Sequence, residues 1–195
     1  MEIQAVVFDL DGVLIDSREA WYHIHKTIFH DKGFKMPDKE EWMKNFWGMD
    51  IITVCGNFGF SKEETERTIK TKDMLLLDNI GKITIFDGVI SALKKLKEKH
   101  IKIGVVSNNK REFVEKVVRK FNIESFFDLV IGDEYGPKPK PDGLLKMLGI
   151  FGAEKSEAIF VGDTETDKLT GKAAGVKTLI IGKDIENIEW ILNFL

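Results

Sequence analysis

Two aspartates, Asp9 and Asp11, lie directly before Gly12 at the end of an uncharged apolar run that spans residues 3–8. The run is rich in β-branched residues, so it predicts a strand buried on both faces of a parallel sheet. Open α/β sheets bind ligands at the carboxyl ends of their strands, and two adjacent carboxylates there repel each other unless a cation or a proton intervenes. The pair therefore indicates divalent-metal chemistry. The simpler alternative is a turn at Asp11-Gly12 with Asp9 as a local cap.

Three later predicted strands, at residues 101–106, 127–131 and 158–162, also end in polar segments. Those segments are Ser107-Asn108-Asn109, Gly136-Pro137-Lys138-Pro139-Lys140-Pro141 and Gly162-Asp163-Thr164-Glu165-Thr166-Asp167. The aspartates would attract Mg²⁺, which prefers oxygen ligands and commonly bridges to a substrate phosphate. Lys138, Ser107 and backbone amides would donate to the phosphate oxygens. One carboxylate could then attack phosphorus while its neighbour acts as acid and base.

The elements that must position these residues alternate from residue 84 onward. Helices are predicted at 88–99, 110–121, 141–148 and 166–174, between the strands already named and a last strand at 177–181. Such alternation implies parallel strands joined by right-handed crossovers. The predicted fold class is therefore α/β, with a doubly wound parallel-sheet (Rossmann-like) core over residues 1–15 and 84–195. Residues 185–195 predict a short amphipathic helix that closes the core.

Between the first strand and the rest of the core, residues 16–83 predict a helical insertion. The expected helices cover 17–31, 38–46, 49–57 and 61–79, separated by glycine- and proline-containing breaks. The first of them resembles a capping box in which Asp16 caps the helix and Glu19 reaches back.

The 195 residues include 43% hydrophobic and 31% charged residues, a composition typical of a globular domain. The formal net charge of −3 does not show the basic excess that is typical of proteins that bind nucleic acids. No apolar stretch approaches the roughly 18 residues that a membrane helix needs, and no basic segment precedes the first strand. We therefore expect a cytoplasmic protein with no membrane partner. Cys55 is the single cysteine, which rules out an intrachain disulfide and a multi-cysteine zinc site. The oligomeric state has no sequence signature.

Four segments together resemble the motifs of the haloacid dehalogenase-like superfamily. They are Asp9-x-Asp11-Gly12-Val13, Ser107-Asn108, Lys138-Pro139-x-Pro141 and Gly162-Asp163-x-x-x-Asp167, in that order and each after a predicted strand. The helical insertion is similar to the family's type-one cap, and Phe86-Asp87-Gly88-Val89 resembles its return from cap to core. The branch with the greatest similarity is that of the phosphoglycolate phosphatase-like hydrolases.

The resemblance implies a Mg²⁺ site and a pair of catalytic carboxylates. Asp9 would be the nucleophile and a metal ligand, and Asp11 the general acid/base that also offers its backbone carbonyl to the metal. Asp163 would be the second carboxylate ligand, and Asp167 would complete the shell directly or through water.

The resemblance also implies a phosphate-binding set. Ser107, the Asn108 amide and Lys138 would hold the transferring phosphoryl group and offset its developing charge. Lys140 is a rival for the lysine position, but the proline spacing favours Lys138. In the insertion, residues 44–48 resemble the cap segment that faces the active site in this family, so Lys44 and Trp47 are candidate substrate contacts.

Arg18, just beyond the first motif, is a third candidate for substrate specificity. The resulting expectation is a Mg²⁺-dependent phosphatase that hydrolyses a small phosphorylated metabolite, phosphoglycolate-like, pyrophosphate or similar, through an aspartyl-phosphate. The alternatives are a phosphomutase of the β-phosphoglucomutase type and a catalytically silent binding module of the same fold. A dehalogenase is disfavoured, since that branch lacks the second aspartate and Asp11 is present here.

Overall fold

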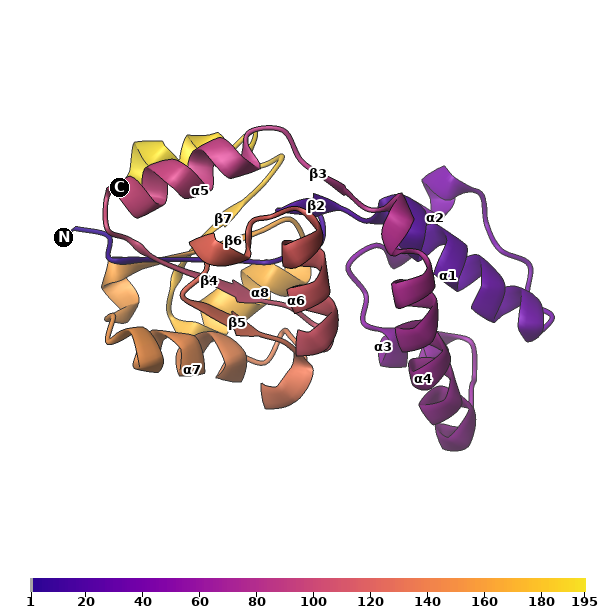
Figure 1. Ribbon diagram of the computed structural model, residues 1–195. Helices are drawn as coiled ribbons and strands as arrows, with labels where there is room; N and C mark the ends of the chain where they lie inside the picture. Colours follow the sequence, from indigo (N-terminus) through magenta and orange to yellow (C-terminus); the bar gives the residue numbers. More distant parts are fainter. Residues whose placement is uncertain (1) are drawn as a thin grey trace. The chain divides into compact units, whose positions relative to one another are not determined.

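A computed structural model describes residues 2–195 and divides the chain into two compact units (Figure 1). The first unit contains the chain up to Asp16 together with Ile85–Leu195, and the second is Ser17–Thr84. Among the helices of residues 2–195, none combines the length and apolar character needed to cross a membrane.

The first unit is built on a five-stranded sheet in which every neighbouring pair is parallel. The strands are β1 (Ala5–Phe8), β4 (Lys102–Val106), β5 (Leu129–Ile131), β6 (Ala158–Gly162) and β7 (Lys177–Ile180), in the order β5-β4-β1-β6-β7. Each predicted strand is present, and the doubly wound α/β fold class is confirmed. The central strand β1 is completely buried, as its uncharged sequence predicted.

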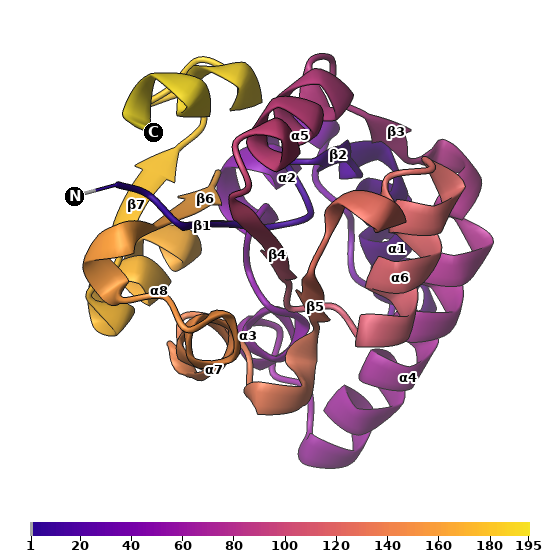
Figure 2. The same ribbon diagram turned by 60° about the vertical axis from the view of Figure 1, so that its left-hand side comes forward.

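Helices cover both faces of this sheet (Figures 1 and 2). They are α5 (Val89–Glu98), α6 (Arg111–Lys120), α7 (Asp142–Phe151) and α8 (Glu165–Ala174), with short 3₁₀ helices η2 (Glu124–Phe126), η3 (Asp133–Tyr135), η4 (Lys155–Glu157) and η5 (Ile188–Phe194). Helix α5 lies on one face with η5 packed against it, and α7 lies on the opposite face. Both faces of the sheet are therefore shielded from water, which is why its strands are apolar on both sides.

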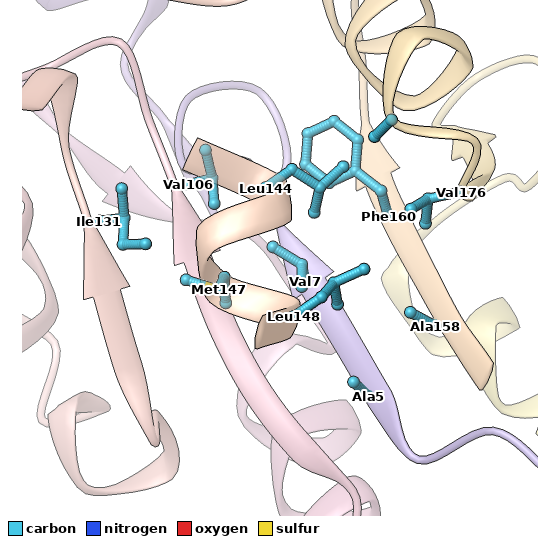
Figure 3. Close-up of a cluster of buried hydrophobic side chains, with 11 residues drawn as sticks. Ala5, Val7, Val106, Ile131, Leu144, Met147, Leu148, Ala158, Phe160 and Val176 are labelled. Atoms are coloured by element: carbon cyan, nitrogen blue, oxygen red, sulfur yellow. The ribbon is translucent and has the colours of Figure 1, made fainter. Parts of the chain in front are cut away.

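The core under α7 shows how the sheet is held (Figure 3). Leu144 and Met147 of α7 lie against Val7 and Phe160 of the central strands, and all four are fully buried. Gly104 of β4 lies beneath the helix, where a Cβ atom would be 2.0 Å from the Met147 sulfur. The missing side chain lets the helix pack closely on the middle of the sheet.

The second unit consists of four helices and a 3₁₀ turn. They are α1 (Arg18–Asp31), α2 (Lys39–Phe46), α3 (Ile51–Asn57), α4 (Lys62–Asp78) and η1 (Ile80–Lys82). Three of these helices begin at capping side chains: Asp38 before α2, Asp50 before α3, and Ser61 before α4 in a full capping box with Glu64. These local signals account for the predicted helix starts at 38, 49 and 61.

The structure differs from or adds to the sequence analysis at three places. Asp16 and Glu19 do not form a capping box: Ser17 precedes α1, no side chain caps that helix, and Glu19 instead pairs with Lys39 and His23. The short helix predicted over residues 185–195 is present as the 3₁₀ helix η5, which packs against α5. Two short strands, β2 (Ile15–Asp16) and β3 (Thr84–Ile85), pair with each other and escaped prediction, because two residues carry no periodic signal.

A buried hydrogen bond holds the interior of the second unit. The indole N–H of Trp42 donates to Nδ1 of His25 at 2.7 Å, and both side chains are almost fully buried. Burial lowers the pKa of His25 from 6.5 to about 4. A neutral ring is required, because a protonated Nδ1 cannot accept from the indole.

We expect this pair to make the second unit sensitive to acid. A folded-state pKa below the unfolded one means that the unfolded chain binds more protons, so stability falls as the pH drops from 6.5 toward 4. Between pH 7 and pH 5 the loss attributable to His25 should be about 2 kcal/mol. Urea unfolding at the two pH values measures it. His25→Gln, whose amide oxygen can accept from Trp42 without titrating, should remove this part of the pH dependence, and an unchanged dependence would contradict the assignment.

Candidate active site

The register of the parallel strands brings the polar segments to one edge of the sheet. Phe8, the last residue of β1, lies level with Val105 of β4 and Val161 of β6. The residues that follow these strands therefore emerge side by side at the carboxyl edge. This arrangement places Asp9 between the loop that begins at Ser107 and the loop that begins at Asp163, as the strand alternation predicted.

Lys138 is the centre of the site. Its ammonium lies 2.7 Å from Oδ1 of Asp9 and 2.5 Å from Oδ1 of Asp167. The three side chains are buried, and Asp167 is completely inaccessible to solvent. Lys140, the rival candidate, is exposed two residues later, so the structure brings Lys138 and not Lys140 to the carboxylates.

Asp167 uses both carboxylate oxygens. While Oδ1 accepts from Lys138, Oδ2 accepts from the Thr164 hydroxyl at 2.6 Å and from the backbone N–H groups of Thr164 and Asp163. Thr164 is the N-cap of α8, so the same contacts start that helix and fix the acidic loop. Glu165, which could also have ordered the loop, is exposed and pairs with Lys168.

Three carboxylates converge closely enough to share a cation. Asp9, Asp163 and Asp167 each offer an oxygen, and these oxygens lie within 4.8 Å of one another. Carboxylate oxygens are the ligands that hard divalent cations such as Mg²⁺ prefer. The donor set therefore fits the predicted metal site.

Two glycines make room for these carboxylates. A Cβ on Gly12 would lie 2.0 Å from Oδ2 of Asp163, and the glycine also has a φ of +80°, which other residues rarely adopt. A Cβ on Gly162 would lie 2.2 Å from Cβ of Asp167. The close approach explains why a glycine follows Asp11 and another precedes Asp163.

The crowding of like charges changes the protonation of the site. Burial raises the pKa of Asp9 well above its usual range; Lys138 opposes that shift, and the neighbouring carboxylates of Asp167, Asp163 and Asp11 add to it. Burial disfavours the charged form of Lys138, but Asp167 and Asp9 outweigh it and raise the pKa of the ammonium. The lysine is therefore a permanent cation, and the site as a whole carries an excess of negative charge.

The loop after β4 supplies hydrogen-bonding groups on the other side of Asp9. Ser107 is buried, and its hydroxyl oxygen accepts from the backbone N–H of Asn109 at 3.1 Å. The side chain of Asn108 clamps the backbone of Lys138: its Oδ1 accepts from the Lys138 N–H at 2.6 Å, and its Nδ2 donates to the Lys138 carbonyl at 3.3 Å. The clamp ties the lysine segment to the serine loop.

Asn109 was not among the predicted site residues, yet it reaches the site. Its Nδ2 donates to Oδ2 of Asp11 at 2.7 Å, and the asparagine is buried while Asp11 is partly exposed. The only sequence signal was its place as the third residue of the polar segment after the strand.

The three residues predicted to contact substrate lie in the second unit. Arg18 is the first residue of α1, and Lys44 is exposed in the last turn of α2. Trp47 follows α2, with its ring edge-on to Trp42 at 5.9 Å between centroids. Their role in specificity stays a prediction.

Comparison with known proteins identifies the family of the chain. A family model for haloacid dehalogenase-like hydrolases matches residues 6–181, a span that contains every residue of the site. The chain belongs to this family. The hydrolase is 31% identical to the pyrophosphatase PpaX of Halalkalibacterium halodurans over 100% of this chain and 90% of that protein.

Further relatives of this haloacid dehalogenase-like hydrolase are similar over most of their length. The phosphoglycolate phosphatase of Aquifex aeolicus is 30% identical over 91% of this chain and 84% of the relative. The crystal structure of a subfamily IA hydrolase from Geobacter sulfurreducens superposes with a TM-score of 0.74 at 29% identity, covering 99% of this chain and 96% of that one.

The excess of negative charge predicts opposite stability effects for two substitutions in metal-free protein. Lys138→Met leaves buried carboxylates uncompensated and should lower the free energy of unfolding by roughly 3 kcal/mol. Asp9→Asn removes one of the repelling charges and should raise it by about 1 kcal/mol. Denaturant unfolding in the presence of a chelator measures both. Glu124→Gln, which removes an exposed carboxylate outside the site, is the control; a destabilised Asp9→Asn variant would contradict the charge analysis.

Proposed function

We propose that this hydrolase is a Mg²⁺-dependent phosphatase that acts on a small phosphorylated metabolite through an aspartyl-phosphate. The observation that carries the proposal is the Lys138 ammonium between Asp9 and Asp167, with Asp163 beside them, at the carboxyl edge of the sheet. A cluster of carboxylates and one fixed cation suits a metal and a phosphoryl group together. The names of the relatives, a pyrophosphatase and a phosphoglycolate phosphatase, support the substrate class.

Asp9 is the proposed nucleophile. Lys138 contacts its Oδ1 and holds the carboxylate in one orientation. In the first step a carboxylate oxygen of Asp9 bonds to phosphorus, the bond from phosphorus to the leaving oxygen breaks, and Asp11 gives its proton to that oxygen. In the second step Asp11 takes a proton from water, the water oxygen bonds to phosphorus, and phosphate leaves Asp9 as a free carboxylate.

The transferring group is held by donors from two loops. Lys138 supplies a charged donor, and Ser107 has its hydroxyl oxygen engaged by a backbone N–H, which leaves the hydroxyl proton to donate outward. The Asn108 amide is the third proposed donor, and its side chain keeps Lys138 in register with Ser107. Donors fixed in this way stabilise the charge that develops on the phosphoryl oxygens.

Asp9, Asp163 and the backbone carbonyl of Asp11 are the residues that would hold Mg²⁺. Asp167 already accepts hydrogen bonds at both oxygens, so we assign it to the metal shell through water and to the positioning of Lys138. The bound cation would neutralise the carboxylate cluster and the substrate phosphate. We assign residues 16–83 as the helical cap of this family, and Arg18, Lys44 and Trp47 as its residues for substrate specificity.

Asp9→Asn should abolish turnover while the fold persists, because an amide cannot attack phosphorus as a carboxylate does. We expect Mg²⁺-dependent release of phosphate from an aryl phosphate by the unaltered protein, complete loss on chelation, and a loss of at least about 1,000-fold in the variant. Phosphate release measured by colour development reports all three.

Two further arms of that experiment separate the alternatives. Equal rates for Asp9→Asn and the unaltered protein would refute the nucleophile, and no release at all would favour a silent binding module. Incubation with β-glucose 1-phosphate and a bisphosphate activator tests the phosphomutase: isomerised sugar phosphate without net phosphate release would overturn the hydrolytic reaction. A screen of phosphorylated metabolites, including pyrophosphate and phosphoglycolate, then identifies the substrate.

A further inference from the structure

The hydrogen bond from Asn109 to Asp11 connects two loops that are 98 residues apart in the chain. Asn109 follows β4, and Asp11 follows β1, so the bond spans the edge at which these neighbouring strands end. At 2.7 Å it is short for an amide donor and typical of a charge-assisted bond to a carboxylate. Both side chains lie beyond the strands, so the bond is not one of the hydrogen bonds of the sheet itself.

The backbone of Asn109 is held on two sides. Its N–H donates to the Ser107 hydroxyl at 3.1 Å. On the other side the chain at Gly132 approaches so closely that a Cβ there would lie 2.6 Å from the carbonyl oxygen of Asn109. With its backbone fixed and its side chain only 3% exposed, Asn109 presents its amide in one direction. The side-chain amide of Asn109 is therefore already oriented toward Asp11 before a substrate binds.

Asp11 is the more exposed partner. It is partly exposed and lies on the tight turn that ends at Ile15, where the Gly12 N–H donates to the Ile15 carbonyl at 2.8 Å. A partly exposed carboxylate has several accessible rotamers. A proton donor in catalysis must lie within hydrogen-bond reach of the atom that it protonates, so a tether on this side chain has a direct consequence for turnover.

We propose that Asn109 is a positioning residue that holds the Asp11 carboxyl for proton transfer to the leaving group. The proposal rests on the proposed function, in which Asp11 is the general acid. An N–H donor on Oδ2 disfavours protonation of that oxygen, so we assign the transferable proton to Oδ1. Asn109 thus fixes both the rotamer of Asp11 and the oxygen that faces the leaving group.

Neighbouring Asn108 has a different partner, which makes it a useful comparison. Its side chain engages the Lys138 backbone and not Asp11. A change at Asn108 should disturb phosphoryl binding for every substrate alike. A change at Asn109 should disturb only reactions that need a proton on the leaving oxygen.

The test compares two substrates that differ in leaving group. Dinitrophenolate leaves without a proton, whereas phenolate from phenyl phosphate departs more readily with one. For Asn109→Leu, similar in size but without a donor, we expect kcat/KM for phenyl phosphate to fall on the order of 10- to 100-fold, and that for dinitrophenyl phosphate to fall by less than about 3-fold. Asn109→Ala provides the same comparison if the leucine variant does not fold. Asn108→Ala should lower both values by similar factors.

A double-mutant cycle with Asp11→Asn completes the experiment. If Asn109 acts through Asp11, then Asn109→Leu should have no further leaving-group-selective effect once Asp11 is replaced. Equal losses of kcat/KM on both substrates, or a selective loss that persists without Asp11, would overturn the positioning role while leaving the phosphatase intact. Failure of the unaltered protein to hydrolyse either substrate in an Asp9-dependent manner would instead overturn the proposed function, and this proposal with it.

Discussion

The concentration of negative charge at one edge of the sheet is the constraint on which the rest of the site depends. Asp9, Asp163 and Asp167 offer oxygens within 4.8 Å of one another, and Lys138 is the cation that lies among them. One ammonium cannot balance three closely spaced carboxylates, and burial and repulsion together raise the pKa of Asp9. An arrangement that costs stability in this way is typical of a functional site, where the missing positive charge arrives with a ligand.

The fold remains stable despite the repulsion between these carboxylates because the strands that lead to the site are almost entirely apolar. β1 is completely buried, and α7 packs on its neighbours through Leu144 and Met147 (Figure 3). Burial of that apolar surface stabilises the sheet independently of the charges above it. The charged residues of the site all follow the strands, in loops and in the first turn of α8, so the destabilising groups lie outside the sheet.

The loops in turn hold each other. Asn108 links the serine loop to the Lys138 segment, Asn109 links it to Asp11, and Thr164 fixes Asp167 at the start of α8. Each of these bonds is made by a side chain next to a proposed catalytic or ligand residue. A network of this kind positions the reacting groups without requiring that each loop be rigid by itself.

The sequence by itself predicted the five strands of the parallel sheet, their connection by crossovers and the residue types at their ends, because buried runs and helix signals are local. It also distinguished Lys138 from Lys140 through the spacing of the prolines. Only the tertiary structure decided which oxygen or amide meets which partner, as in the bond from Asn109 to Asp11. That pairing depends on strand register and loop path across 98 residues. The capping box predicted at Asp16 is likewise absent because of a tertiary contact: Glu19 pairs with Lys39 at the start of another helix.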